Sequence, residues 1–419
     1  MEALFEVKYA LDTFYLLLSG TLVMWMAAGF TMLEAGLVRS KNTVEILAKN
    51  IGLYSISCIM YMLVGYNIMY GDSASSIIPG ISFLISGDNT VAEVIAGGED
   101  APVYSNIADF FFQVVFVATA MSIISGAVAE RMKLWSFFLF AVVLSGFIYP
   151  IQGYWSWGEG FLDGLGYSDY AGSGIVHMAG ASAALAAVLL LGPRKGKYGP
   201  DGRARAIPGA NLPLATLGTF ILWMGWFGFN GGSELMVSDV ESANTVALVF
   251  ANTNLAAAAG VVAGLITARL LFGKADLTMG LNGALAGLVA ITAGPDTPSM
   301  LLATMIGAAG GVIVVLSIVT LDKLRIDDPV GAISVHGVVG IWGLLAVLFS
   351  NEEASLVGQL AGIASIFGFV FIASLIVWFL IKVTMGIRVD EEVEYKGVDL
   401  DECGLEAYPE FTGAAGSGR

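Results

Sequence analysis

Two histidines, the only ones among 419 residues, stand in matching stretches of the chain, DYAGSGIVH ending at His177 and DPVGAISVH ending at His336. In each stretch a glycine follows an aspartate by three residues, a valine follows it by seven and the histidine by eight. An imidazole accepts and donates hydrogen bonds and changes charge near neutral pH. Two such rings in contact could relay or share a proton.

The same residue types also have less specialised uses. A single histidine inside a membrane protein commonly makes a hydrogen bond between helices. Two histidines related by a repeat favour a pore or a proton relay, because ionisable groups are costly to bury in a membrane. A zinc site would need further His, Cys or carboxylate ligands, and no HExxH, GxGxxG or P-loop pattern occurs. We therefore expect no metal, no cofactor and no enzymatic activity.

The aspartates that open the two stretches are Asp169 and Asp328. Aspartate at a helix start caps backbone N–H groups and interacts favourably with the helix dipole, and we take this as their main role. Asp169 is also expected to support a vestibule that attracts cations.

The elements that must carry these residues are membrane-spanning helices. Hydrophobic residues make up 57% of the chain and charged residues 13%, and the mean hydropathy is +0.79. A helix needs about 20 apolar residues to cross a bilayer. The sequence predicts an all-α polytopic membrane protein, with glycine pairs such as Gly260/Gly264 and Gly307/Gly311 bringing helices close together. We expect eleven transmembrane helices, at 14–37, 44–70, 109–129, 134–153, 172–192, 213–232, 244–272, 277–293, 300–320, 331–350 and 357–386.

The matching stretches begin the fifth and the tenth of these spans. A repeat of five spans is odd, so spans 1–5 and 6–10 form an inverted repeat, and an eleventh helix follows. Eight residues at ~1.5 Å each place either histidine ~12 Å along its helix. In a hydrocarbon core of ~30 Å, the two rings approach the centre from opposite faces, and we expect them to touch.

The distribution of charge predicts an orientation. Alternate connections hold the basic residues, which places them in the cytoplasm and the N-terminus outside. We therefore expect a multi-pass plasma-membrane protein with a cytoplasmic C-terminus. The formal net charge of −16 argues against nucleic-acid binding. The basic connections contain Arg39, Lys41, Arg131, Lys133, Arg194, Lys195, Lys197, Arg203, Arg205, Arg269, Lys274, Lys323, Arg325, Lys382 and Arg388.

We divide the chain into one membrane domain, 1–386, and an acidic cytoplasmic tail, 387–419. An acidic tail of this kind is commonly a solvated terminus.

The two histidine stretches, with EAGLVRSKN from Glu34, GAVAERMKL from Gly126 and GWFGFNGGS from Gly225, resemble the ammonium transporter family (Amt/Mep/Rh) over residues 10–411. The resemblance is to prokaryotic Amt-type members.

The resemblance implies a homotrimer in which every subunit has its own path for ammonium, ammonia or methylammonium. It makes His177 and His336 the twin pore histidines. It makes Phe112, Phe116, Trp157 and Ser233 the outer cation-recruitment site, with Phe116 and Phe229 as the gate below. Without it, the aromatic residues would be read as a packing stripe and an interfacial belt.

The resemblance also implies a GlnK-type regulatory partner at the tail, but the tail departs from the family pattern. Cys403 stands where the family usually has His, and Leu405 stands where Glu is common. Two other functions stay open. One is an ammonium sensor that signals through the tail to a separate partner, and the other is passage of carbon dioxide or another small neutral molecule.

Overall fold

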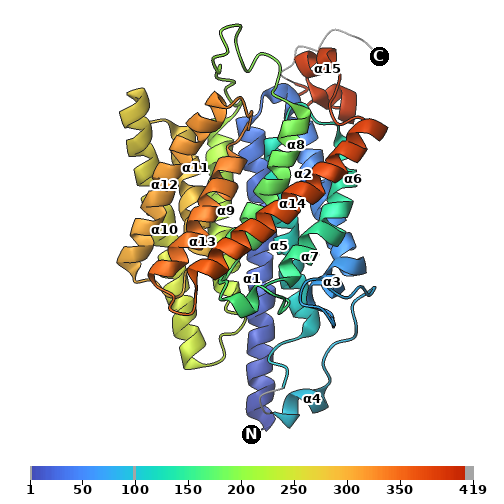
Figure 1. Cartoon of the computed structure of the whole chain (residues 1–419), viewed down its shortest axis with the longest axis vertical. Helices are drawn as coiled ribbons and strands as arrows, with labels where there is room; N and C mark the ends of the chain where they lie inside the picture. Colours follow the sequence, from blue (N-terminus) through green and yellow to red (C-terminus); the bar gives the residue numbers. More distant parts are fainter. Residues whose placement is uncertain (1, 98–100, 411–419) are drawn as a thin grey trace.

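A computed structural model describes residues 2–97 and 101–410 as a bundle of long helices, which is drawn in Figure 1. Its first half contains the helical segments α1 (Glu2–Leu37), α2 (Thr43–Met60) with η2 (Tyr61–Gly65) and α3 (Tyr66–Tyr70), α5 (Asn106–Ala127), α6 (Leu134–Val143) with η3 (Leu144–Ile148) and α7 (Tyr149–Tyr154), and η5 (Ser173–Met178) with α8 (Ala179–Leu191). Its second half contains α9 (Leu212–Gly232), α10 (Val240–Phe272), α11 (Leu277–Thr292), α12 (Met300–Lys323), η6 (Ile333–Val338) with α13 (Val339–Ala346) and η7 (Val347–Phe349), and α14 (Leu356–Thr384).

The all-helical fold class is confirmed. In the described part of the chain, nine helices are long and apolar enough to span a membrane, and two apolar helices, Leu277–Thr292 and Ile333–Phe349, are shorter. Together they coincide with the eleven predicted spans. The first helix is longer than the predicted span, since α1 begins at Glu2 and the span was predicted from residue 14. Its N-terminal part continues past the bundle and contacts the short helix α4 (Val91–Ala96), so packing extends the helix beyond its apolar stretch (Figure 1).

Glycines bring α10, α11 and α12 together backbone to backbone, as their spacing predicted. A Cβ atom on Gly260 would lie 2.2 Å from the carbonyl oxygen of Gly283, and one on Gly311 would lie 2.3 Å from that of Gly260. No side chain fits at these positions without moving a helix. In a membrane, where lipid tails are as apolar as side chains, this close approach is what holds helices together.

The two histidine helices open with the same local structure. Each begins with a π-helical turn, η5 or η6, that follows a glycine with a positive φ, +107° at Gly172 and +85° at Gly331. Positive φ costs glycine little because it has no Cβ. The carboxylate of Asp169 accepts the N–H groups of Gly174 and Ile175, and that of Asp328 accepts the N–H of Ile333. The repeated sequence therefore builds the same helix start twice.

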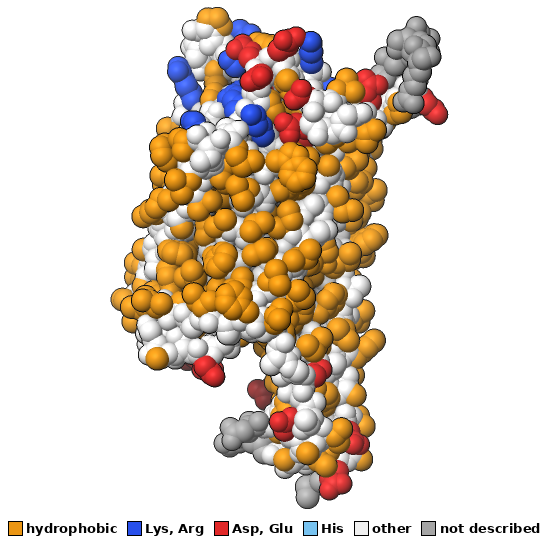
Figure 2. Space-filling view, turned by 90° about the vertical axis from the view of Figure 1, so that its right-hand side faces the viewer, with side chains coloured by type: hydrophobic (Ala, Val, Ile, Leu, Met, Phe, Trp, Pro, Cys, Tyr) orange, Lys and Arg blue, Asp and Glu red, His pale blue; other side chains and the backbone are white. Residues whose placement is uncertain are grey.

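Hydrophobic side chains surround the middle of the molecule, and charged side chains gather at its two ends (Figure 2). The end that carries the clustered Lys and Arg side chains, with α15 (Glu391–Lys396) and the last described residues, is called the basic end. The opposite end, where α1 begins, is called the acidic end.

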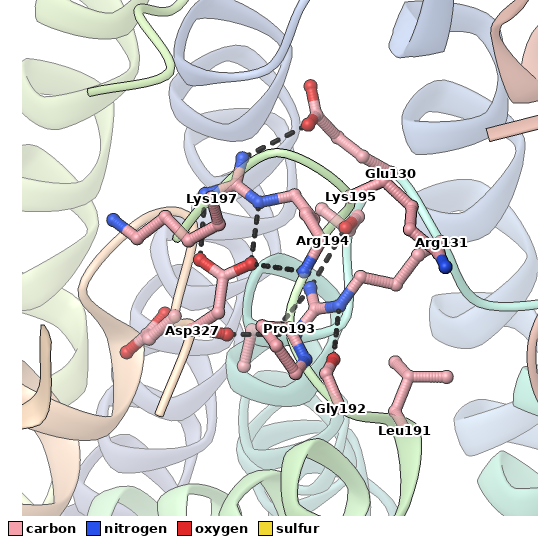
Figure 3. Close-up of polar contacts among 12 residues, drawn as sticks. Glu130, Arg131, Leu191, Gly192, Pro193, Arg194, Lys195, Lys197 and Asp327 are labelled. Carbon is pink, nitrogen blue, oxygen red and sulfur yellow. Dashed lines mark hydrogen bonds and ion pairs between the residues drawn. The ribbon is translucent and has the colours of Figure 1, made fainter. Parts of the chain in front are cut away.

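A buried ion network joins the connections at the basic end (Figure 3). Glu130 Oε2 lies 2.8 Å from Arg39 and 3.0 Å from Arg194, and Arg194 Nε lies 2.9 Å from Asp327 Oδ2. Arg131 donates to the backbone carbonyls of Gly192 and Asp327. Glu130 adopts a φ of +71°, which is uncommon for a residue with a Cβ. Its carboxylate accepts hydrogen bonds from Arg39 and Arg194, and these offset the energetic cost of that backbone conformation.

The described part of the tail packs against this end instead of lying free in solvent. Glu394 is 1% exposed and accepts from Arg388 and from the N–H of Lys195. Asp399, 2% exposed, lies in η8 (Asp399–Cys403) and accepts the N–H of Glu45. The expectation of a simply solvated acidic terminus is wrong for these residues, because their carboxylates satisfy backbone donors of the bundle.

Candidate functional site

The two histidines meet at the centre of the bundle. Their Nδ1 atoms lie 3.2 Å apart and their ring centroids 5.1 Å apart, with 24° between the ring planes. Both rings are buried, with exposures of 0% for His177 and 2% for His336. The predicted contact is confirmed.

A hydrogen bond between two Nδ1 atoms fixes the chemistry of the pair. If both rings are neutral, the donor ring has a bare Nε2 and the acceptor ring has an Nε2–H. The pair thus presents one acceptor and one donor at its two outer edges. Nε2 of His177 has no hydrogen-bond partner. That nitrogen is available to a small polar molecule in an otherwise apolar surrounding.

Aromatic rings hold the histidines in place. Trp226 and Phe229 stack on His177, at 4.9 Å and 5.3 Å between centroids, and Phe30 lies 6.1 Å from His336. The indole Nε1–H of Trp226 donates to Thr292 Oγ1 at 2.8 Å, which fixes the ring. The sequence analysis missed Trp226, although it precedes Phe229 by three residues and so shares its helix face.

A stacked pair of phenyl rings, Phe116 and Phe229, lies next to His177. Their rings stack with centroids 4.1 Å apart and 28° between planes. Phe116 is 1% and Phe229 0% exposed.

Beyond the phenyl rings lies a cavity of about 300 Å³ that opens toward the acidic end. It brings together all four residues of the expected recruitment site, Phe112, Phe116, Trp157 and Ser233. The sequence analysis missed its other lining residues, which include Tyr70, Tyr104, Asp109, Gln113 and Tyr170. Asp109 and Gln113 share one face of α5 with Phe112 and Phe116, a helical spacing that could have found them, whereas the three tyrosines come from other segments.

Two hydrogen bonds orient the recruitment residues. The Ser233 hydroxyl donates to the carbonyl of Phe229 at 2.8 Å, so its oxygen keeps lone pairs for accepting. The indole Nε1–H of Trp157 donates to the carbonyl of Asp169 at 2.9 Å. The polar edge of the indole is therefore engaged, and the ring contributes its π system, 6.1 Å from Phe116. Aromatic faces and hydroxyl lone pairs together suit a cation that carries N–H donors.

Asp169 does not line this cavity but supports its wall. Besides the backbone N–H groups of η5, its carboxylate lies 3.2 Å from the hydroxyl of Tyr167. Burial raises the pKa of Asp169 to about 6, although these hydrogen bonds favour the ionised form.

On the other side of the histidines, a vestibule of about 340 Å³ opens at the basic end. Its lining includes Arg194, Lys197, Asn282, Asp322 and Asp328. The aromatic cavity, the phenyl pair, the two imidazoles and this vestibule thus follow one another through the bundle.

Comparisons with known proteins agree with this arrangement. The family model described as Ammonium Transporter Family matches residues 14–408. The chain is 40% identical to the ammonium transporter Amt2 of Archaeoglobus fulgidus, over 96% of this chain and 88% of that protein. It is 41% identical to the putative ammonium transporter sll1017 of Synechocystis, over 95% and 89%.

Among solved structures, a protein named Sensor Amt Protein superposes with a TM-score of 0.86 at 34% identity, covering 95% of this chain and 99% of the other. Candida albicans Mep2 superposes with a TM-score of 0.80 at 25% identity, covering 97% and 92%. The family model spans most of the chain, and the relatives match over nearly their full length. The chain therefore belongs to the ammonium transporter family and is a multi-pass membrane protein, not an enzyme.

Proposed function

We propose that the protein conducts ammonium or ammonia across the plasma membrane through the bundle of each subunit. The path begins at the aromatic cavity, passes Phe116 and Phe229, runs along His177 and His336 and ends in the basic-end vestibule. The observation that carries the proposal is the imidazole pair, buried between an aromatic cavity and a vestibule that open at opposite ends.

Each part of the path has a physical task. The aromatic cavity holds the cation by π faces and a hydroxyl acceptor, and desolvated cation–π contacts are worth about 2 kcal/mol or more. Potassium, which has no N–H groups, gains no hydrogen bond from Ser233. The dry segment beyond the phenyl rings penalises any ion, whereas neutral ammonia can hydrogen-bond to imidazole nitrogens.

The proposal includes the orientation and the assembly. Basic connections stay in the cytoplasm, so the aromatic cavity faces outward and the vestibule inward. The family resemblance supports a homotrimer and a GlnK-type regulator that meets the cytoplasmic face. The docked positions of Glu394 and Asp399 give such a regulator a structured tail to meet.

The function is tested by measuring radiolabelled methylammonium uptake and ammonium-evoked current in proteoliposomes, with His177→Ala and His336→Ala as variants. We expect each variant to lose selective uptake, either through loss of flux or through admission of potassium. Normal flux with full potassium exclusion in both variants would overturn the role of the imidazole pair.

The same measurement separates transport from sensing. The match to Sensor Amt Protein and the tail packed on the bundle are the observations that favour a sensor. A sensor without transport activity would bind ammonium, for example as a change in tryptophan fluorescence, and would show neither flux nor current.

A further inference from the structure

A buried carboxylate lies beside the conduction path and has no place in the mechanism described so far. Glu34 belongs to the last turn of α1 and is 1% exposed. Its Oε2 accepts from Ser125 Oγ at 2.5 Å and from Asn50 Nδ2 at 3.2 Å. Its Oε1 has no hydrogen-bond partner. A buried carboxylate oxygen without a hydrogen-bond partner is energetically costly. In membrane proteins such groups are found mainly where they have a function.

Glu34 and His336 line the same small cavity, of about 10 Å³. Gly126 lines it too, and a Cβ on that glycine would lie 3.5 Å from Glu34 Cδ, so the carboxyl group borders this space directly. A cavity of roughly 10–15 Å³ holds one water molecule. Since Nδ1 of His336 faces His177, Nε2 is the ring nitrogen left for the cavity.

Lys49, a buried cation on α2, makes no direct ion pair with Glu34. Lys49 is 0% exposed, and its ammonium pairs with Glu45 Oε1 at 2.9 Å, one helical turn away on the same helix. Lys49 also lies 3.4 Å from the carbonyl of Ser125. Among the described residues Glu34 forms no ion pair, so no cation directly opposes the arrival of a proton at its carboxylate.

The small cavity and the vestibule are neighbours that share part of their walls. Asn282 and Val330 line both spaces, and the vestibule continues to the carboxylates of Asp322 and Asp328 at the basic end. A proton that reaches Glu34 therefore has acceptors farther along in the direction of the basic end.

We propose that Glu34 is the proton acceptor on the vestibule side of the histidine pair, so that a proton removed from ammonium leaves by way of His336 and Glu34. The inference rests on the proposed function and adds to it the route of the proton. It makes Glu34 part of the transport machinery and not only a hydrogen-bond partner between α1, α2 and α5.

The transfer balances as follows. An N–H bond of ammonium breaks, its electron pair stays on nitrogen, and ammonia remains. The proton joins Nε2 of His177, the shared proton shifts to Nδ1 of His336, and the proton on Nε2 of His336 leaves through one water to Glu34, where an O–H bond forms. The products are ammonia, two neutral imidazoles with exchanged tautomers, and a carboxylic acid that passes its proton to the vestibule.

The test compares wild type with Glu34→Gln in proteoliposomes, by solid-supported-membrane current and methylammonium flux on the same preparations. Gln keeps the shape and the acceptor for Ser125 but cannot take up a proton at the working pH. We expect at least a tenfold loss of current. Ser57→Ala is the matched control, since it removes another buried hydrogen bond of α2, to Ser145, away from the cavity, and it should keep current within threefold of wild type.

The outcomes separate this inference from the proposed function. Wild type with neither flux nor current refutes the function itself. Wild-type flux without any current, or Glu34→Gln with current within twofold of wild type, overturns the role of Glu34 and leaves transport intact.

An infrared measurement covers the case in which Glu34→Gln does not fold. Difference spectra of reconstituted wild type, with and without ammonium, should contain the carbonyl band of a buried carboxylic acid. That band should shift in Glu34→Asp, which keeps the carboxyl group. Absence of an ammonium-dependent band, or a band unchanged in Glu34→Asp, would contradict the proposal.

Discussion

At the scale of single residues, two hydrogen bonds determine which groups the aromatic cavity presents to a ligand. The hydroxyl of Ser233 and the indole N–H of Trp157 both donate to backbone carbonyls. This leaves an oxygen lone pair and a π face toward the ligand, and both attract a cation.

We predict that Trp157→Leu weakens apparent ammonium affinity by roughly tenfold or more, because a desolvated cation–π contact is worth about 2 kcal/mol. The concentration dependence of current measures this. Trp135→Leu is the control, since Trp135 is 69% exposed at the start of α6 and lines neither the aromatic cavity nor the vestibule. Equal half-saturation values for Trp157→Leu and wild type would contradict a role in recruitment.

At the scale of helices, two structural features position the site. The π-helical turns η5 and η6 set the register of the two histidines, and the glycine contacts among α10, α11 and α12 set how closely the second half can pack. Both decide whether rings from opposite ends of the membrane reach each other.

We predict that Gly311→Ala lowers the free energy of unfolding by about 1–3 kcal/mol, since its methyl group would press on the backbone of Gly260 and overpacking costs about this much. Gly368→Ala meets nothing within 4 Å, so it should be neutral or slightly stabilising, as alanine favours helix over glycine. Thermal unfolding in detergent compares the two. A Gly311→Ala protein as stable as Gly368→Ala would show that α10 and α12 are not held by this contact.

At the scale of the whole molecule, the ion network at the basic end joins connections that are far apart in the sequence. Glu130 pairs with Arg39 and Arg194, which lie in two other connections. Arg194 also pairs with Asp327, which lies in a further connection. Burial by itself raises the pKa of Glu130, but the hydrogen bonds and charges of Arg39 and Arg194 outweigh it and lower that pKa to about 2. Arg194 and Arg131 likewise lower the pKa of Asp327 below its usual range, against the effect of burial.

A lowered carboxylate pKa contributes stability above the unfolded value and loses it as the pH falls through the folded value. We predict that Glu130→Gln is less stable than wild type at neutral pH by about 3 kcal/mol, because two arginines lose a buried partner. The difference should shrink as pH falls from about 4.5 toward 2. Unfolding followed by tryptophan fluorescence across this range checks it.

Glu392→Gln is the control for that experiment. Glu392 pairs with Lys396 in a fully solvated position, so its removal should change stability little at any pH. If the difference in the free energy of unfolding between Glu130→Gln and wild type does not change with pH, the charge of Glu130 does not stabilise the network.

The sequence by itself determined the helical class, the places of the spans and the contact of the two histidines. The helical class and the spans depend on local hydropathy. The histidine contact depends on the repeated spacing from aspartate to histidine, because helix starts at opposite ends of a bilayer then bring His177 and His336 to similar depths. The outer orientation stays a prediction that rests on the distribution of Lys and Arg. The roles of Phe112, Phe116, Trp157, Ser233 and Phe229 also stay predictions, although the structure brings all five together.

Only the tertiary structure decided which other side chains meet at the path. Trp226 against His177, Glu34 beside His336, and Glu130 between Arg39 and Arg194 are contacts between segments that share no motif. Each depends on how helices rotate about their own axes and cross, which glycine contacts and buried hydrogen bonds set over long sequence separations. Hydropathy marks where a helix runs but does not specify which neighbour a polar side chain will face.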